Sequence, residues 1–374
     1  MQEEITIKEI SKKNADNLEI IDVRDESSYA YGHIPGSINI PAEKLQTVEL
    51  SKDKELYVCC QSGNISFEIA EDLRSKGYKA FSLEGGYIGW LREHIAQSDG
   101  ETAKRVEDSI KKKFHKSLFS RFAKAIVEYE LISPNDKIAV CISGGKDSFV
   151  MAKLFQELKR HNKIPFELTF LVMDPGYSKE NREIIESNAK LLNIPITVFE
   201  TDIFESVFNI EKSPCYLCAR MRRGHLYHKA RDLGCNKIAL GHHYDDVIET
   251  ILMGMLYGGQ MQTMMPKLKS ENFEGMQLIR PMYLIREETI KAWRDYNNLR
   301  FIQCACRFTQ TCSTCDPSGG GSKRLKVKQL IRTLESEDPG IEQNIFRSVE
   351  NVNLKTVIAY KDKDGIRHRY TEDF

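Results

Sequence analysis

Short apolar runs alternate with longer amphipathic stretches through the central part of the chain. The runs cover residues 137–142, 167–173, 195–200 and 237–241, and their length and composition predict buried strands. Strands that alternate with helices favour parallel pairing. The pattern therefore predicts an α/β fold with a doubly wound parallel sheet that helices cover on both faces.

The pattern on either side of this region differs, and it divides the chain. Apolar runs at residues 20–24 and 55–60 predict the strands of a smaller α/β unit. Residues 304–322 are rich in Cys, Ser, Thr and Gly and predict a loop. We expect an α/β domain at residues 1–98, a linker helix at 99–133, a larger α/β domain at 134–335 and a C-terminal extension at 336–374.

The amino-acid composition limits the class of protein to which the chain can belong. With 374 residues, 41% of them apolar and 29% charged, the chain is typical of globular proteins. Lys and Arg number 54, as do Asp and Glu, so only local patches can attract nucleic acid. No apolar stretch approaches a membrane span, and the first residues lack the basic and apolar regions of a signal peptide, so we expect neither. We expect a cytoplasmic protein, whose ten cysteines indicate redox, persulfide or metal chemistry rather than a disulfide framework.

The clearest chemistry lies between the first central strand and its helix. The stretch consists of Ser143, Gly144, Gly145, Lys146, Asp147 and Ser148. Its glycines let the backbone approach a ligand closely, and the N–H groups of such a turn, with the helix dipole, attract an anion, usually a phosphate. The aspartate stands where the Walker loop needs Ser or Thr, which excludes that class. A structural glycine turn is the alternative.

This stretch resembles the Ser-Gly-Gly-x-Asp-Ser loop of the PP-loop ATP pyrophosphatases. The resemblance implies an adenine nucleotide alpha hydrolase-like domain that binds the pyrophosphate part of ATP and releases AMP. Ligands of such sheets bind beyond the carboxyl ends of the strands. Motifs that follow the other central strands are therefore expected to meet this loop in one cleft.

Two such motifs follow later strands. Asp174 is placed for a ribose hydroxyl or a metal, and an ordinary Asp-Pro-Gly turn is an equal alternative. Two adjacent carboxylates end the motif at residues 241–246, where Mg²⁺ on ATP would relieve their repulsion; an N-cap role for one of them is the alternative. The expected nucleotide contacts beyond the loop are Asp174, Gly241, His242, Asp245 and Asp246.

In the N-terminal unit, a predicted strand ends in Cys60, and a helix follows shortly after. A sulfur held over the N–H groups of a helix start is favoured as thiolate and is a good nucleophile. Cys59 points to the opposite side of the strand and is expected in the core.

The surrounding residues resemble the rhodanese family over almost the whole unit. The matching segments are Asp-Val-Arg at residues 22–24, residues 32–41, the loop that begins at Cys60, Gly85 with Gly86, and Trp90. The resemblance implies that Cys60 carries a persulfide. Ile65 stands where rhodanese loops usually carry Arg, so thiosulfate need not be the donor. A degenerate docking domain is the alternative.

Cys215 and Cys218 form a Cys-x-x-Cys motif, which brings two thiols within reach of one metal, one cluster or each other. Cys304 can supply a third sulfur. The same loop holds Cys306, Cys312 and Cys315, so the third ligand is open among these four, and a zinc site is an alternative. Cys141 and Cys235 are expected in the core.

Six motifs in order resemble the tRNA 2-thiocytidine synthetase family across about residues 115–335. They lie at residues 143–148, 215–224, 241–246, 257–259, 266–268 and 279–281. The resemblance implies adenylation of a tRNA cytidine followed by sulfur insertion, with ATP, Mg²⁺ and a [4Fe–4S] cluster held by Cys215, Cys218 and Cys304. It implies Cys60, Asp147 and Asp245 as catalytic residues. The insertion after Cys306 departs from the family pattern and puts the third ligand in doubt.

Basic runs at residues 111–116, 220–229 and 323–328 suit RNA phosphates, although each run alone is typical of a solvated helix face. The expected partners are tRNA, a persulfide donor such as a cysteine desulfurase, and, as a candidate, a second copy of the chain. The expected function is ATP-dependent tRNA thiolation, with sulfur relayed through a persulfide on the rhodanese-like unit and an iron–sulfur site. The alternatives are thiolation of another base or a small molecule, and a reaction like that of lysidine synthetase, which needs neither the Cys-x-x-Cys motif nor a rhodanese unit.

Overall fold

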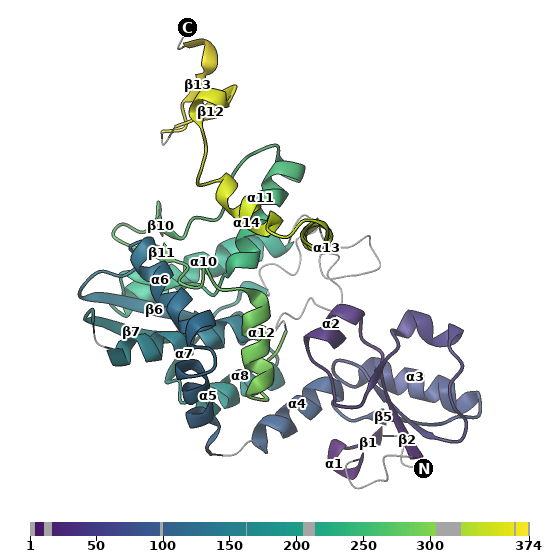
Figure 1. The fold of residues 1–374 in the computed structure, drawn as a ribbon. Coiled ribbons are helices and arrows are strands. Elements are labelled where there is room, and N and C mark those ends of the chain that lie inside the picture. Colours follow the sequence, from purple (N-terminus) through teal and green to yellow (C-terminus); the bar gives the residue numbers. More distant parts are fainter. Residues whose placement is uncertain are drawn as a thin grey trace. The chain divides into compact units, whose positions relative to one another are not determined.

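The computed structural model describes residues 4–10, 17–97, 100–161, 163–204, 214–303, 323–362 and 364–372. The chain divides into two compact units. The first contains residues 1–243 and 266–319, and the second contains residues 244–265 and 320–374. The first unit holds both predicted α/β regions, each with its own sheet (Figure 1).

The N-terminal sheet has the order β1-β5-β4-β2-β3, and its neighbouring strands pair in parallel. Its strands are β1 (Glu4–Ile5), β2 (Leu18–Asp22), β3 (Ile38–Asn39), β4 (Glu55–Cys59) and β5 (Lys79–Leu83). The connecting helices are α1 (Ile7–Ile10), α2 (Glu26–Tyr31), the 3₁₀ helix η2 (Ala42–Thr47), α3 (Asn64–Ser75) and α4 (Gly86–Ala96). Because β4 is the central strand, it delivers Cys60 to the middle of the carboxyl edge.

The stretch expected to form one linker helix forms three helical pieces. They are α5 (Thr102–Lys111), the π-helical turn η3 (His115–Phe119) and α6 (Ser120–Glu128). Val106, Leu118 and Phe122 from the three pieces are all buried in one core with residues of the central sheet. The chain therefore bends between the pieces, which keeps the apolar residues of each on the same core.

The central sheet has the order β10-β11-β9-β6-β7-β8, and it is parallel except for the β10–β11 pair. Its strands are β6 (Asp136–Ile142), β7 (Phe166–Asp174), β8 (Ile196–Glu200), β9 (Lys237–Ala239), β10 (Lys267–Lys269) and β11 (Gln277–Ile279). The predicted parallel α/β fold is thus confirmed. The predicted strand at 237–241 is shorter in the structure and ends at Ala239.

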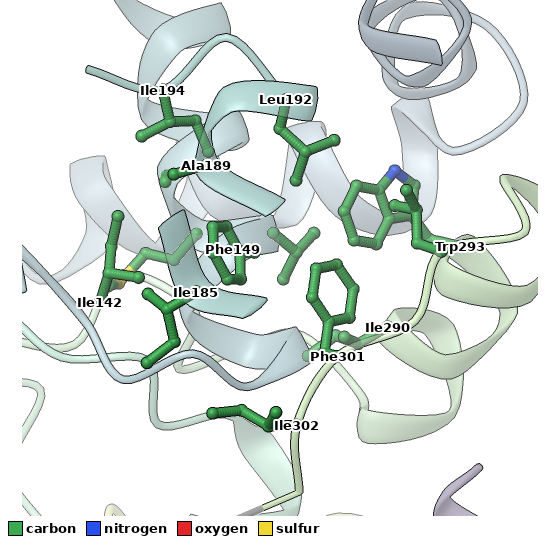
Figure 2. Packing of buried hydrophobic residues seen from close by; sticks show 14 of the residues in the cluster. Ile142, Phe149, Ile185, Ala189, Leu192, Ile194, Ile290, Trp293, Phe301 and Ile302 are labelled. Atoms are coloured by element: carbon green, nitrogen blue, oxygen red, sulfur yellow. The ribbon is translucent and has the colours of Figure 1, made fainter. Parts of the chain in front are cut away.

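The helices of this region are α7 (Lys146–His161), α8 (Lys179–Leu191), α10 (Pro214–Asp232) and α12 (Glu287–Tyr296). Phe301, just beyond α12, lies between Phe149 and Trp293 (Figure 2), with ring centroids 5.1 and 6.5 Å away. This aromatic stack holds the segment after α12 against α7, whose first residues belong to the predicted phosphate loop.

The second unit consists mainly of helices. They are α11 (Tyr244–Gly258), α13 (Lys323–Glu337) and α14 (Ile341–Ser348), followed by η6 (Leu354–Thr356), β12 (Ala359–Lys361), β13 (Arg367–Arg369) and η7 (Tyr370–Glu372). Tyr244 of α11 stacks on Phe346 of α14 at 4.7 Å between ring centroids. Among the helices that the structure describes in either unit, none has the length and apolar character needed to cross a membrane.

Candidate functional site

Gly144 gives the loop between β6 and α7 its shape. Its φ angle is +91°, a conformation that side chains other than glycine rarely adopt. A Cβ atom at this position would lie 2.7 Å from both Ile185 Cγ1 and Ile302 Cδ1. Two carbon atoms that are not bonded to each other cannot approach so closely. Conformation and space therefore both require glycine, and the loop backbone lies directly on these two side chains.

A hydroxyl network closes the same loop. The Ser148 hydroxyl accepts a hydrogen bond from the Ser143 N–H at 3.2 Å and donates one to the Gly145 carbonyl at 2.9 Å. The two ends of the loop are thereby tied together, while the turn opens at the N-terminus of a 16-residue helix. Backbone N–H groups at such a helix start form a site for a phosphate group.

The Lys146 ammonium is held inside the protein. The residue is only 4% exposed, and its Nζ lies 3.1 Å from Asp147 Oδ2 and 3.2 Å from Glu287 Oε1. Burial is the largest single influence and favours the neutral amine, but Asp147, Tyr31 and Glu287 together outweigh it and raise the pKa of Lys146. Glu287 was not predicted as a site residue. No sequence motif indicates that the first turn of α12 contacts a loop some 140 positions earlier.

The segment after β9 meets the start of α7, as expected. A Cβ atom at Gly241 would lie 3.3 Å from the Asp147 carbonyl carbon and the Ser148 nitrogen. His243 is buried, and its Nε2 lies 3.9 Å from Asp147 Oδ1. His242, between these residues, is half-buried. The first part of the motif at residues 241–246 therefore contacts the predicted phosphate loop.

Asp174 uses its carboxylate to close the turn after β7. Its Oδ1 accepts hydrogen bonds from the N–H groups of Gly176 at 2.9 Å and Tyr177 at 2.6 Å. Its Oδ2 lies 3.3 Å from Arg182 Nη1. These contacts are those of the turn alternative, and a role in ribose binding stays a prediction.

Asp245 and Asp246 lie in the first turn of α11, in the second unit. Arg324 of α13 meets this acidic helix face, with its Nη2 3.3 Å from Asp246 Oδ1 and its Nε 2.8 Å from Glu249 Oε2. Lys328 Nζ lies 3.8 Å from Glu249 Oε1. Burial raises the pKa of Glu249 despite these cations. Two residues of the basic run at 323–328 are thus engaged with carboxylates inside the unit.

The Cys60 side chain is buried and forms hydrogen bonds with the loop and helix that follow it. Its sulfur accepts a hydrogen bond from the Gly63 N–H at 3.2 Å and donates one to the Ser66 hydroxyl at 3.3 Å. The residue is 4% exposed. A Cβ atom at Gly86 would lie 2.5 Å from the Cys60 carbonyl oxygen, so the glycine of α4 allows the loop to fold down on the helix start.

A buried ion pair supports this loop from below. Arg24 binds Asp22 through two contacts, Nε to Oδ1 at 2.9 Å and Nη2 to Oδ2 at 2.6 Å. The Arg24 guanidinium lies 3.9 Å from the ring centroid of Tyr87 and donates from Nη1 to Gln61 Oε1 at 3.4 Å. The Asp-Val-Arg motif thus positions the residue that follows Cys60.

Cys59 faces the opposite side of the strand, as expected. It is fully buried, and burial raises the pKa of its thiol well above the ordinary value. Cys141 and Cys235 are also buried. Burial raises the pKa of Cys141 to about 12, so all three thiols stay protonated and unreactive at neutral pH.

A cavity of about 1040 Å³ opens beside the Cys60 loop. One wall comes from Gln61, Ser62 and Gly85, and another from Asn181 and Ser187 of α8. The cavity is at the upper end of the sizes that hold small ligands. Gln61 and Ser62, the two residues that follow Cys60, line this cavity, whereas Cys60 itself does not.

Comparisons with known proteins agree with this geometry. Residues 111–306 match the family model of the PP-loop domain, and residues 6–93 match that of the rhodanese-like domain. The first match alone spans more than half of the chain. The chain belongs to the PP-loop family. Its N-terminal part is a rhodanese-like domain, so both expected resemblances are confirmed.

The relatives of this PP-loop protein are named as enzymes. A tRNA-cytidine(32) 2-sulfurtransferase of Citrifermentans bemidjiense is 34% identical over 243 residues, which are 64% of this chain and 91% of the relative. A protein of the same name from Syntrophotalea carbinolica is 33% identical over 262 residues, 69% of this chain and 96% of the relative. The expectation of an enzyme of this family is confirmed.

One solved structure is similar to the PP-loop protein at lower identity. It is the U34-tRNA thiolase NcsA from Methanococcus maripaludis with its [4Fe-4S] cluster. The identity is 22% and the TM-score 0.48, and the similarity covers 63% of this chain and 79% of that chain.

The expected metal ligands lie mostly beyond what the structure describes. Cys215 and Cys218 belong to the start of α10, where a spacing of three residues places two positions on the same helix face. Cys304, Cys306, Cys312 and Cys315 lie outside the described residues. Within the described ranges, no group of three His, Cys, Asp or Glu residues is arranged to hold a metal ion, so the ligand set stays a prediction.

Proposed function

We propose that the chain is an ATP-dependent tRNA sulfurtransferase that forms 2-thiocytidine. The observation that carries this proposal is the loop at residues 143–148, a nest of N–H groups between a parallel strand and a helix. The same chain carries the cradled Cys60. The names of the relatives support the tRNA cytidine as substrate, and they give no support to another base or to a reaction like that of lysidine synthetase.

The first half-reaction is proposed to be adenylation of the base. The C2 oxygen of the cytidine attacks the α-phosphorus of ATP, a P–O bond forms, and the bond to pyrophosphate breaks. Because Asp147 and Glu287 already neutralise Lys146, the backbone N–H groups supply most of the attraction for pyrophosphate. Asp245 and Asp246 are proposed to bind the Mg²⁺ that accompanies ATP.

Asp147 is proposed to act on the reacting groups through its second oxygen. Asp147 Oδ1 is buried and has no hydrogen-bond partner within the described residues, and His243 Nε2 lies 3.9 Å from it. A buried carboxylate oxygen without a donor is costly unless a ligand satisfies it. Its place at the start of α7 suits a contact with Mg²⁺ or with the nucleotide.

The sulfur is proposed to arrive through Cys60. A donor such as a cysteine desulfurase transfers its terminal sulfur to the Cys60 sulfur, and the donor leaves as a thiol that takes up the proton of Cys60. The terminal sulfur on Cys60 then attacks C2 of the adenylated base, a C–S bond forms, the C–O bond breaks and AMP leaves. A second cysteine of the chain attacks the Cys60 sulfur, forms a disulfide with it and leaves the new sulfur on the base, and an external thiol reductant then converts the disulfide back to two thiols.

The donor set of Cys215, Cys218 and Cys304 fits an iron–sulfur cluster, because thiolates are the ligands that such clusters prefer. The first two lie one helical turn apart on α10. With these three cysteines as ligands, such a cluster would leave one iron able to bind an external sulfur. Cys215 and Cys218 would hold the cluster at the start of α10.

The test is a reconstituted reaction with unmodified tRNA, MgATP and a persulfide donor, in which pyrophosphate, AMP and thionucleoside are measured. We expect AMP and 2-thiocytidine in equal amounts. Cys60→Ala should lose the thionucleoside but keep the release of pyrophosphate, and loss of both would mean that Cys60 is structural. A second test measures the tRNA nucleosides of a strain from which the gene has been deleted. If 2-thiocytidine persists there and no other thionucleoside is lost, the proposal is contradicted.

A further inference from the structure

Tyr31 ends helix α2 of the rhodanese-like domain, yet its polar atoms contact the PP-loop domain. Its hydroxyl accepts a hydrogen bond from the backbone N–H of Lys146, with 3.4 Å between N and O, and donates one to the Ile302 carbonyl at 3.1 Å. Its own carbonyl accepts a hydrogen bond from Arg294 Nη1 at 2.6 Å. Burial raises the pKa of the Tyr31 hydroxyl to about 12, so the proton it donates is retained at neutral pH.

Ile302 connects the Tyr31 hydroxyl to the loop at residues 143–148 through a second set of contacts. The space that a Cβ atom of Gly144 would occupy is filled by Ile302 Cδ1, so this side chain packs against the loop backbone. Figure 2 shows Ile302 and Ile185 in the same packed region as Phe149 of α7. Tyr31 therefore holds the loop directly at Lys146 and indirectly through Ile302.

Tyr31 is also tied to the Cys60 loop within its own domain. Arg24 Nη2 donates to the carbonyl of Gly32, the residue after Tyr31, at 2.8 Å. Arg24 Nη1 donates to Gln61 Oε1, the residue after Cys60, at 3.4 Å. Hydrogen bonds and two short backbone steps thus connect the sulfur-carrying loop with the start of α7.

We propose that Tyr31 is a positioning residue for the ATP loop, supplied by the rhodanese-like domain. The inference rests on the proposed binding of ATP at residues 143–148. The hydroxyl fixes the Lys146 peptide and the Ile302 carbonyl relative to each other, which keeps the N–H groups of the loop in the arrangement that binds pyrophosphate. The domain that carries sulfur thereby also completes the nucleotide site.

The test compares Tyr31→Phe with Tyr29→Phe in the full-length protein. Both residues lie on α2, and the Tyr29 hydroxyl donates to the Ser37 carbonyl within the rhodanese-like domain. Loss of the Tyr31 hydroxyl removes two modest hydrogen bonds, so the Kd for MgATP, measured by calorimetry, should rise about three- to tenfold. The KM for ATP should rise by the same factor with kcat little changed, and Cys60 should accept persulfide sulfur as in the unaltered protein. Tyr29→Phe should leave the Kd for MgATP within about twofold.

A second variant, Arg294→Gln, tests whether weaker MgATP binding comes from this network of contacts rather than from general unfolding. Arg294→Gln releases the Tyr31 carbonyl and should also weaken MgATP binding, and the double variant with Tyr31→Phe should lose less than the product of the two effects. Unchanged or tighter MgATP binding by Tyr31→Phe would overturn the inference, and tighter binding would mean that the hydroxyl competes with phosphate. If the unaltered protein does not bind MgATP, the proposed function itself fails, which is a distinct result.

Discussion

Replacing Asp22 with Asn is expected to destabilise the rhodanese-like domain by about 3–5 kcal/mol. The side chains of Arg24 and Asp22 are 6% and 0% exposed, and two short contacts join them. The amide is nearly the same size as the carboxylate but carries no charge. The guanidinium would therefore stay buried with neutral acceptors only, namely the new amide oxygen, the Gly32 carbonyl and Gln61 Oε1. The size of the effect comes from this unpaired charge rather than from a change in packing.

Native-state hydrogen exchange of the β2 and β4 amides measures this loss separately from the stability of the other domain. Glu26→Gln is the matched control, because it removes a carboxylate from the exposed pair with Lys44, whose side chains are 73% and 56% exposed, and should cost less than about 0.5 kcal/mol. Replacing Asp22 with Leu and Arg24 with Met together should recover most of the stability, since no buried charge remains. An Asp22→Asn protein as stable as Glu26→Gln would refute the reasoning.

Three further outcomes are expected. Gly144→Ala places a Cβ 2.7 Å from two isoleucines at a φ of +91° and should abolish detectable MgATP binding in calorimetry, whereas Gly100→Ala, where nothing lies within 4 Å, should bind as before. Cys215→Ala should lower the iron and acid-labile sulfide of anaerobically purified protein from about four per chain; zinc without sulfide in the unaltered protein would contradict the cluster. Arg324→Ala should destabilise the contact between α11 and α13 by about 1 kcal/mol, seen as faster amide exchange in both helices but not in the N-terminal sheet.

Strands β6, β7 and β9 of the central sheet were predictable because burial leaves a largely apolar run in the sequence. The short strands β10 and β11 carry no such run and were not predicted. The run at residues 137–142 became β6, and the carboxyl end of β6 placed the loop with Gly144 where the pattern required it. The fate of single side chains was less predictable. Asp174 serves its own turn, and a carboxylate near a predicted strand end looks the same in the sequence whether it binds the backbone or a ligand.

Contacts between segments that are far apart in the chain leave no recognisable pattern in the sequence. Glu287 meets Lys146, and Tyr31 meets Lys146 and Ile302, but neither Glu287 nor Tyr31 stands out by period, spacing or motif. Local rules of helix and strand act over a few residues, whereas these contacts depend on how two sheets and their helices pack in three dimensions. They are the part of the site that required a structure.

The ion pairs of α13 change how strongly salt should oppose RNA binding. The run at residues 323–328 contains four cations, but Arg324 and Lys328 are engaged with the carboxylates of α11. A cation already neutralised inside the protein displaces no counterion from a phosphate. The slope of the logarithm of tRNA affinity against the logarithm of salt concentration should thus be shallower by about 1.4–1.8 than a count of all four charges implies.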